Sequence, residues 1–396
     1  MTDRLRIKEI IDSIESYRDI DKALITHKIH SPEAYNLDLN DSCIVCEPIF
    51  DYYSKHAQSL KLEFDVPFPP PSNPEFTFID LFAGIGGFRL PLQELGGKCV
   101  FSSEFNTHAQ CVYSLNYGEY PFGDITKISL DLIPNHDVLC AGFPCQPFSI
   151  SGKMKGFEDT RGTLIYNVFK IVEAKQPRIL FLENVKQLIH HNNGKTISTI
   201  LDGFQNLGYK MSYKILNASN FGVPQNRERI ILIGHKEKFF DFKPIKNIPC
   251  GTIRDILDNP RTTKFEYLNE PYTLIEGAKK QASGLIFVGY RNKKIRTVGV
   301  REGTENLSRV HKQPNRIYSV DGVHPTLPSQ ETSGRFWIYD GKNVRKLTIN
   351  ECYKLMGFPD NFIKDNIAGE QYRQVGNAVC IPMIREIMKE IKRQLL

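Results

Sequence analysis

Residues 76–87, FTFIDLFAGIGG, join a short apolar run to a glycine-rich turn. The run 76–82 has the composition of a buried strand, and residues 88–95 after the glycines are compatible with a helix. Glycines at such a turn let a ligand approach the backbone and the positive N-terminus of the helix. We therefore predict a ligand site at this turn, with a purely structural tight turn as the alternative.

The alternation of strand and helix continues along the chain. Further strands are predicted at 99–102, 137–141, 178–182 and 230–234, and further helices at 106–116, 163–174 and 196–206. Strands alternating with helices form a mainly parallel sheet covered on both faces. The segment 245–337, rich in Gly, Pro, Arg and Lys, predicts a second lobe of strands and loops, and helices return at 347–356 and 381–395.

Composition indicates a globular protein. The 396 residues are 24% charged and 41% hydrophobic, with a formal net charge of +6, and this length corresponds to roughly two to three domains. No apolar run reaches the roughly 18–20 residues of a membrane span, and the first residues lack a signal-peptide core. The nine scattered cysteines favour a reducing compartment over a disulfide scaffold. We therefore expect a cytoplasmic protein without a membrane partner.

The charge is unevenly distributed along the chain. Residues 1–75 contain 8 basic and 14 acidic side chains, whereas residues 291–316 contain eight basic side chains against Glu302 and Glu305. The basic residues are interspersed with Gly, Asn, Gln, Tyr and His, which suits loops lying against a phosphate backbone. A solvated surface is the alternative.

Residues 67–74, PFPPPSNP, mark a boundary because consecutive prolines continue neither a helix nor a central strand. The acidic extension that ends with these prolines, residues 1–75, spaces its apolar residues between Leu5 and Ile14 as an amphipathic helix does. Its doublets His27/His30 and Cys43/Cys46 could be read as a zinc site, but we expect a coincidence of spacing. We expect a packing or dimerisation element, because the charge of −6 disfavours direct phosphate binding.

Acidic side chains follow the predicted strands. Glu104 and Asp124 come after successive strands, where an open α/β sheet places carboxylates that accept ribose hydroxyls. A dinucleotide fingerprint requires glycine three residues after Gly86, and that position holds Arg89. The pattern favours a cofactor with ribose and adenine but no pyrophosphate over a nicotinamide dinucleotide.

A candidate nucleophile lies in residues 141–149, AGFPCQPFS. Cys145 is placed between prolines in a loop after a strand, which suits attack better than core packing, although an inert core cysteine is the alternative. Glu183 follows the next strand and so lies on the same rim of the sheet. Arg227 and Arg229 alternate toward one face, although an ion pair with Glu228 would also explain them.

Over residues 76–396 the chain resembles the cytosine-C5 DNA methyltransferases of bacterial restriction–modification systems. One matching motif alone would be weak, but eight in the family's order are highly specific. They are residues 82–87, Glu104, Asp124, 144–146, 183–185, 225–229, 345–348 with Glu351, and 376–379. The extension 1–75 is not part of the family's common core.

The resemblance implies an α/β fold with a Rossmann-like S-adenosylmethionine-dependent methyltransferase domain at 76–244. It also implies a smaller target-recognition domain at 245–337 and C-terminal helices at 338–396 that return to the catalytic domain. The N-terminal extension 1–75, which we expect to be helical, precedes them.

The implied reaction transfers a methyl group from S-adenosylmethionine to C5 of a flipped-out cytosine in a short duplex DNA site. Carbon 5 is a poor nucleophile, so the Cys145 thiolate first adds to C6 while Glu183 holds N3 and the exocyclic amine. Arg229, supported by Arg227, positions the base or Glu183. The resulting enamine attacks the sulfonium methyl, and loss of the C5 proton with elimination of Cys145 releases the product.

Carried over position by position, the resemblance implies two further sets of contacts. The cofactor contacts are Phe82, Gly84, Ile85, Gly87, Glu104, Phe105, Asp124, Ile125, Pro144 and Asn377. Phe105 stands where many members carry a tryptophan that packs on adenine. The DNA contacts are Gln146, Ser149, Arg291, Arg296, Gln313, Arg316 and Thr326, with Gln313 filling the space left by the flipped base. No metal is implied.

We expect duplex DNA as the macromolecular partner and a cognate restriction endonuclease as a functional partner, from which the methyltransferase protects host DNA at the bacterial nucleoid. The expected state is a monomer, with dimerisation through residues 1–75 as the alternative. RNA cytosine methylation, as in a related branch that modifies transfer RNA, is disfavoured by the long basic recognition segment. A catalytically silent DNA-binding protein is disfavoured by the joint presence of Cys145, Glu183 and Arg229.

Overall fold

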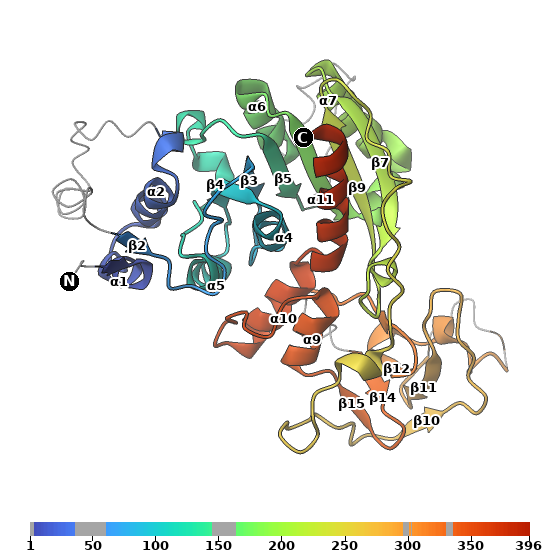
Figure 1. The fold of residues 1–396 in the computed structure, drawn as a ribbon. Coiled ribbons are helices and arrows are strands. Elements are labelled where there is room, and N and C mark those ends of the chain that lie inside the picture. The colour runs from blue at the N-terminus through green and yellow to red at the C-terminus, as the bar shows by residue number, and fades with distance from the viewer. Residues whose placement is uncertain (1–3, 36–60, 145–163, 296–300, 302, 330–335) are drawn as a thin grey trace.

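The computed structural model describes residues 4–35, 61–144, 164–295, 301, 303–329 and 336–396. Its centre is a six-stranded sheet in the order β4-β3-β5-β6-β9-β7 (Figure 1). These strands are β3 (Phe76–Leu81), β4 (Gly97–Ser103), β5 (Val138–Gly142), β6 (Ile179–Val185), β7 (Lys210–Asn217) and β9 (Glu228–His235). All five predicted strands are confirmed, whereas β7 was not predicted.

Four neighbouring strands, β4, β3, β5 and β6, run parallel, so their carboxyl ends meet at one edge of the sheet. Strand β9 runs antiparallel to both β6 and β7. The sheet is therefore mixed, although the four strands β4, β3, β5 and β6 are parallel as predicted. The reversal matters because it brings the residues just before β9 to the edge where β6 ends.

Helices cover both faces of the sheet because alternate strand residues point to opposite sides. In β5, Val138 and Cys140 pack into one apolar cluster with α4 (Arg89–Glu94), α5 (Thr107–Tyr117) and α11 (Ile381–Leu395). Leu139 and Ala141 pack into a second cluster with α6 (Leu164–Lys175) and α7 (Lys195–Asn206). The helices predicted for this part of the chain are confirmed.

Two shorter helices connect the sheet to a smaller lobe (Figure 1). Helix α9 (Ile349–Met356) begins at a capping box in which Thr348 Oγ1 accepts from the Glu351 N–H at 3.1 Å. Helix α10 (Ala368–Asn377) was not predicted. Its last turn carries Gln374 and Asn377, which reach the carboxyl edge of the main sheet.

The smaller lobe contains a five-stranded sheet in the order β10-β11-β12-β14-β15. Its strands are β10 (Tyr272–Leu274), β11 (Phe287–Arg291), β12 (Arg316–Ser319), β14 (Trp337–Tyr339) and β15 (Val344–Lys346). The lobe of strands and loops expected for 245–337 is present, but its sheet extends to Lys346, past the expected boundary. A short pairing of β8 (Gln225–Asn226) with β13 (His324–Pro325) ties the lobe to the main body.

The N-terminal extension packs against the free edge of the main sheet, beside β4 and α5 (Figure 1). It contains α1 (Ile7–Ser13) and α2 (Asp19–His30), together with a parallel pair formed by β1 (Arg4–Arg6) and β2 (Lys61–Glu63). The predicted amphipathic helix is confirmed in α1, where Ile7, Ile10 and Ile11 are buried. The proline-rich stretch is also docked, because Gln93 Nε2 donates to the carbonyls of Phe68 and Pro69.

Candidate active site

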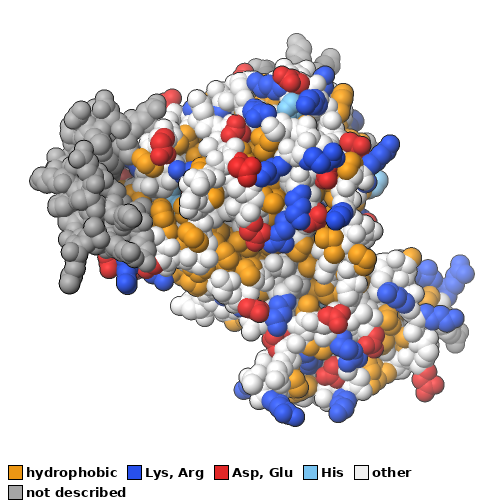
Figure 2. All heavy atoms as spheres, in the orientation of Figure 1, with side chains coloured by type: hydrophobic (Ala, Val, Ile, Leu, Met, Phe, Trp, Pro, Cys, Tyr) orange, Lys and Arg blue, Asp and Glu red, His pale blue; other side chains and the backbone are white. Residues whose placement is uncertain are grey.

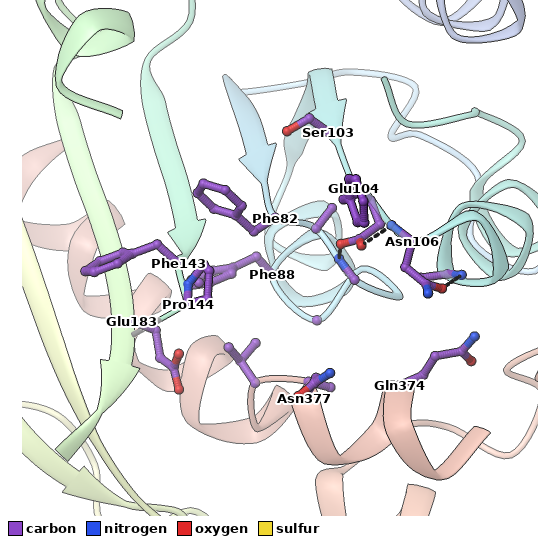
Figure 3. A pocket seen from close by; sticks show the side chains of 18 of the residues that line it. Phe82, Phe88, Ser103, Glu104, Asn106, Phe143, Pro144, Glu183, Gln374 and Asn377 are labelled. Atoms are coloured by element: carbon purple, nitrogen blue, oxygen red, sulfur yellow. Dashed lines mark hydrogen bonds between the residues drawn. The ribbon is translucent and has the colours of Figure 1, made fainter. Parts of the chain in front are cut away.

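A cavity of about 870 Å³ opens where the parallel strands of the main sheet end. This is the edge at which open α/β sheets bind ligands, and the volume lies within the range of small-molecule sites. Its walls come from the glycine-rich turn, from the carboxyl ends of β4, β5 and β6 with the residues after β4 and β5, from Arg227 and Arg229, and from the end of α10. Figure 3 shows Glu104 and Glu183 on opposite sides, with Asn377 and Gln374 on a helix along the lower edge of the view.

The glycine-rich turn is fixed by close packing against Gly86 and Gly87. A Cβ on Gly86 would lie 2.4 Å from the ring of Tyr117, whose hydroxyl donates to the Gly86 carbonyl at 3.1 Å. A Cβ on Gly87 would lie 2.8 Å from Val379. Phe82, Gly84 and Gly87 line the cavity, whereas Ile85, a predicted cofactor contact, is buried in the apolar core on the far side of the turn.

Glu104 and the glycine-rich turn hold each other in place. Its carboxylate accepts the Gly84 N–H at 2.8 Å and the Asn106 N–H at 2.7 Å (Figure 3). Burial raises the pKa of Glu104 above its ordinary value, against the opposing effect of these N–H groups. The group therefore presents a fixed acceptor to the cavity.

Two further side chains line the same end of the cavity. Phe105 has 77% of its surface exposed, so an aromatic face is available to a ligand. Asp124 accepts from the Thr126 hydroxyl at 2.7 Å and backbone N–H at 3.0 Å, and this hydrogen bonding lowers its pKa. Ile125 lines the cavity beside it.

The opposite wall carries an ion pair. Arg229 Nε lies 2.9 Å from Glu183 Oε1, and both side chains are largely buried. Burial raises the pKa of Glu183, while Arg229 and Arg227 act to lower it. A carboxyl group with a raised pKa, held by one cation at a cavity wall, is suited to sharing a proton with a bound polar group.

Arg227 lines the cavity, but its guanidinium is hydrogen-bonded to backbone carbonyls. It donates to the carbonyls of Leu327 at 3.0 Å, Gly376 at 3.0 Å and Ala378 at 2.8 Å. Burial, reinforced by the charge of Arg229, lowers the pKa of Arg227 to about 9. Arg227 therefore joins the lobe to the end of α10 at the cavity wall.

The loop that carries the predicted nucleophile starts at the same wall. Pro144 lines the cavity, and Asn184 Nδ2 holds the preceding carbonyl of Phe143 at 2.9 Å. Cys145, Gln146 and Ser149 lie outside the described residues. Glu183 and the residue adjoining Cys145 thus share one cavity.

Comparisons with known proteins identify the family. The family described as C-5 cytosine-specific DNA methylase matches residues 76–393. The chain belongs to this family. It is therefore a DNA (cytosine-5-)methyltransferase, and the matched region begins where the N-terminal extension ends.

Two bacterial relatives illustrate how far this methylase resembles others. The Type II methyltransferase M.HpaII of Haemophilus parainfluenzae is 41% identical over 348 residues, which cover 83% of this chain and 93% of that protein. The Type II methyltransferase M.HhaI of Haemophilus parahaemolyticus is 38% identical over 327 residues, covering 80% and 94%.

Solved structures share the fold. Entamoeba histolytica methyltransferase EhMeth has a TM-score of 0.58 at 19% identity and covers 82% of this chain and all of its own. The S. pombe Dnmt2 methyltransferase has a TM-score of 0.56 at 17% identity and covers 81% of this chain and 100% of its own.

The described residues predicted to contact DNA lie in or beside the methylase's smaller lobe. Arg291 pairs with Glu270 and lies 5.7 Å from the centre of the Trp337 ring, while Arg316 donates to the His311 carbonyl at 2.9 Å. Gln313 is exposed, whereas Thr326 donates to the Asn226 carbonyl at 2.8 Å. Arg296 lies outside the described residues. Figure 2 shows further Lys and Arg side chains spread over the visible face of the lobe.

Several cavity residues of the methylase were not predicted. Phe88, Asn106, Arg373 and Gln374 all line it. Only Asn106 had a recognisable local signal, because asparagine before a helix is a typical N-cap, and its side chain accepts from Ala109 N–H at 2.9 Å. Phe88, Arg373 and Gln374 reach the cavity because of the way in which α4 and α10 pack against the sheet, which no local sequence pattern indicates.

Two of the remaining expectations concern metals and membranes. Within the described ranges there is no group of three or more side chains arranged to hold a metal ion. His27 and His30 instead contact protein atoms, and Cys43 and Cys46 lie outside those ranges. Among the described helices, none is long and apolar enough to cross a membrane.

Proposed function

We propose that this methylase uses S-adenosylmethionine and forms a covalent cysteine adduct with a cytosine flipped out of duplex DNA. The observation that carries the proposal is that Glu104 and the Glu183–Arg229 pair face one cavity from opposite walls. One end suits a nucleoside, and the other suits a polar base that must be protonated to react.

The cavity residues fit the cofactor. Glu104 is locked by two backbone N–H groups and keeps acceptor capacity for ribose hydroxyls, and the exposed Phe105 ring suits stacking on adenine. Asp124, Ile125, Pro144, Asn377 and the turn at Phe82, Gly84 and Gly87 would complete the site. When bound there, S-adenosylmethionine supplies an electrophilic methyl group on a sulfonium.

At the other end the chain's own residues activate the base. Glu183 holds N3 and the exocyclic amine of cytosine, and its raised pKa favours sharing a proton with N3. Protonation draws electrons from the ring, so the Cys145 thiolate can add to C6 and make C5 nucleophilic. Arg229 orients Glu183, and Arg227 keeps the wall in place through its three carbonyl contacts.

Duplex DNA is the proposed substrate. Because addition at C6 requires a base that is out of the stack, the target cytosine must flip out of the duplex. The lobe at 245–337 is the proposed target-recognition element and carries exposed cations for phosphate contact, including Lys293, Lys294 and Lys312. Residues 338–396 return to the catalytic domain. Methylation would protect host DNA in a bacterial cytoplasm from a cognate endonuclease, and the Type II names of the bacterial relatives support that role. We propose a monomer.

A transfer assay tests the proposal. Wild-type protein with tritiated S-adenosylmethionine and duplex DNA should label the DNA, whereas Cys145→Ser should not. Absence of label with wild type, or full label with Cys145→Ser, contradicts it. Competing transfer RNA against duplex DNA distinguishes the RNA methyltransferase, and DNA binding without transfer identifies the silent alternative.

A further inference from the structure

A buried polar cluster lies behind the cofactor wall, outside the cavity. Its centre is Glu119, which has no exposed surface and accepts from Arg89 Nη1 at 2.7 Å and from Ser102 Oγ at 3.1 Å. The Arg89 guanidinium also lies over the rings of Tyr113 and Tyr117. The proposed chemistry uses none of these groups.

The N-terminal extension supplies two imidazoles to this cluster. His27 of α2 donates from Nδ1 to the Ala23 carbonyl at 2.8 Å and accepts the Ser102 N–H on Nε2 at 3.0 Å, with Glu119 Oε1 3.1 Å away. His30 donates from Nε2 to the Gly118 carbonyl at 2.9 Å. Its Nδ1 faces Glu119 Oε2 at 3.6 Å.

Three of the segments that build the cofactor wall touch this cluster. Arg89 is the first residue of α4, directly after the glycine-rich turn. Ser102 lies in β4, just before Glu104. Phe122 joins them, because it donates to the Ser102 carbonyl at 2.8 Å, accepts from the Glu104 N–H at 2.8 Å, and places its ring 4.8 Å from that of His27.

The buried Glu119 carboxylate is ionised and depends on its neighbours. Burial would raise the pKa of Glu119, but the Arg89 guanidinium, 2.7 Å away, outweighs it and holds the pKa well below its ordinary value. Burial lowers the pKa of His30 to about 3. An ionised carboxylate without exposed surface depends on its partners, because removing one leaves a buried charge under-compensated.

We propose that the N-terminal extension is a positioning element of the cofactor site, with His27 as the positioning residue. The His27 ring holds the Ser102 backbone and the Glu119 carboxylate in place. Glu119 in turn holds Arg89, directly after the glycine-rich turn, and Ser102 lies just before Glu104, so these contacts fix the positions of the turn and of Glu104. The inference rests on the proposed cofactor. It gives residues outside the family match an influence on cofactor affinity through the residues that they hold in place.

Paired variants of the full chain test the inference. His27→Leu removes the acceptor for the Ser102 N–H and should raise the KM for S-adenosylmethionine roughly tenfold, with kcat at saturating cofactor nearly unchanged. His27→Gln keeps an acceptor and should restore most of the affinity. His136→Leu is the matched control, because His136 is also buried and bonds a backbone carbonyl, that of Pro134. An unchanged KM in His27→Leu, or an equal rise in His136→Leu, overturns the inference.

Hydrogen exchange on the wild-type protein gives a test that needs no variant. Coupling is reciprocal, so saturating S-adenosylmethionine should slow amide exchange in α2 as well as in residues 82–125. Protection of 82–125 with unchanged exchange across 19–30 overturns the positioning role and leaves the cofactor assignment standing. Protection of neither region removes the cofactor assignment and the positioning role with it.

Discussion

Arg229 Nε lies 2.9 Å from Glu183 Oε1, and Arg229 Nη1 donates to the neighbouring Glu228 carbonyl at 2.9 Å. The guanidinium of Arg227, two residues earlier, instead donates hydrogen bonds to three backbone carbonyls. The two arginines of one motif therefore have different tasks. Arg229 pairs with the carboxyl group at the cavity wall, and Arg227 holds the segments that form this wall.

Replacing Glu183 with glutamine should abolish most of the activity. An amide keeps the shape but cannot transfer a proton to N3, so the methyl-transfer rate should fall by about 10²- to 10⁴-fold. Single-turnover transfer from tritiated S-adenosylmethionine measures this step. Glu228→Gln is the matched control, because Glu228 pairs with Lys186 at a half-exposed position. A Glu183→Gln enzyme as fast as Glu228→Gln would exclude the proposed proton transfer.

Replacing Arg227 with lysine should destabilise the protein. A single ammonium cannot reach the carbonyls of Leu327, Gly376 and Ala378 together, so the free energy of unfolding should fall by about 3 kcal/mol. Urea denaturation measures the change. Arg254→Lys serves as the comparison, because the Arg254–Asp321 pair is exposed. Equal urea midpoints for the two variants would show that Arg227 is not a structural link.

The parts of the site that sequence predicted are those with local signals. Glu104 follows β4 and Glu183 lies at the carboxyl end of β6, so the rule that parallel strands end at one edge placed both on one rim. Asp124 lines the same cavity but does not follow a strand as predicted, because it caps the short 3-10 helix Ile125–Lys127. The antiparallel direction of β9 and the existence of the polar helix α10 could not be predicted from local sequence. Both depend on packing against residues that are distant in the chain. The contacts of His27 and His30 were missed for the same reason, since Ser102 and Gly118 are far along the chain and leave no pattern in the spacing of the histidines.

Stability should fall as the pH is lowered below about 6.5. Burial lowers the pKa of His324 from 6.5 to about 4, so the unfolded chain binds more protons than the folded one between these values. Stability therefore rises with pH across this window, by about 1 kcal/mol per pH unit for each such histidine. Urea unfolding of wild type and His324→Gln from pH 5 to 6.5 tests the sign and size. His324→Gln should show the smaller slope, and parallel curves would contradict the shift.

The glycine-rich turn offers a paired test of what its glycines do. Gly84 and Gly86 both have positive φ, of 56° and 84°. A Cβ on Gly84 would meet no heavy atom within 4 Å. The free energy of unfolding of Gly84→Ala should therefore fall only by the strain of a left-handed backbone at alanine, about 1–2 kcal/mol. A Cβ on Gly86 would also meet the buried Tyr117 ring at 2.4 Å.

Gly86→Ala should therefore lower the melting temperature more than Gly84→Ala when both are measured without cofactor. Tyr117 cannot relieve the clash cheaply, because its hydroxyl is bonded to the Gly86 carbonyl and Arg89 lies over its ring at 4.8 Å. Moving the ring would disturb the cluster around Glu119. Equal losses in the two variants would mean that backbone conformation alone, and not the packing of α5 behind the turn, requires glycine at position 86.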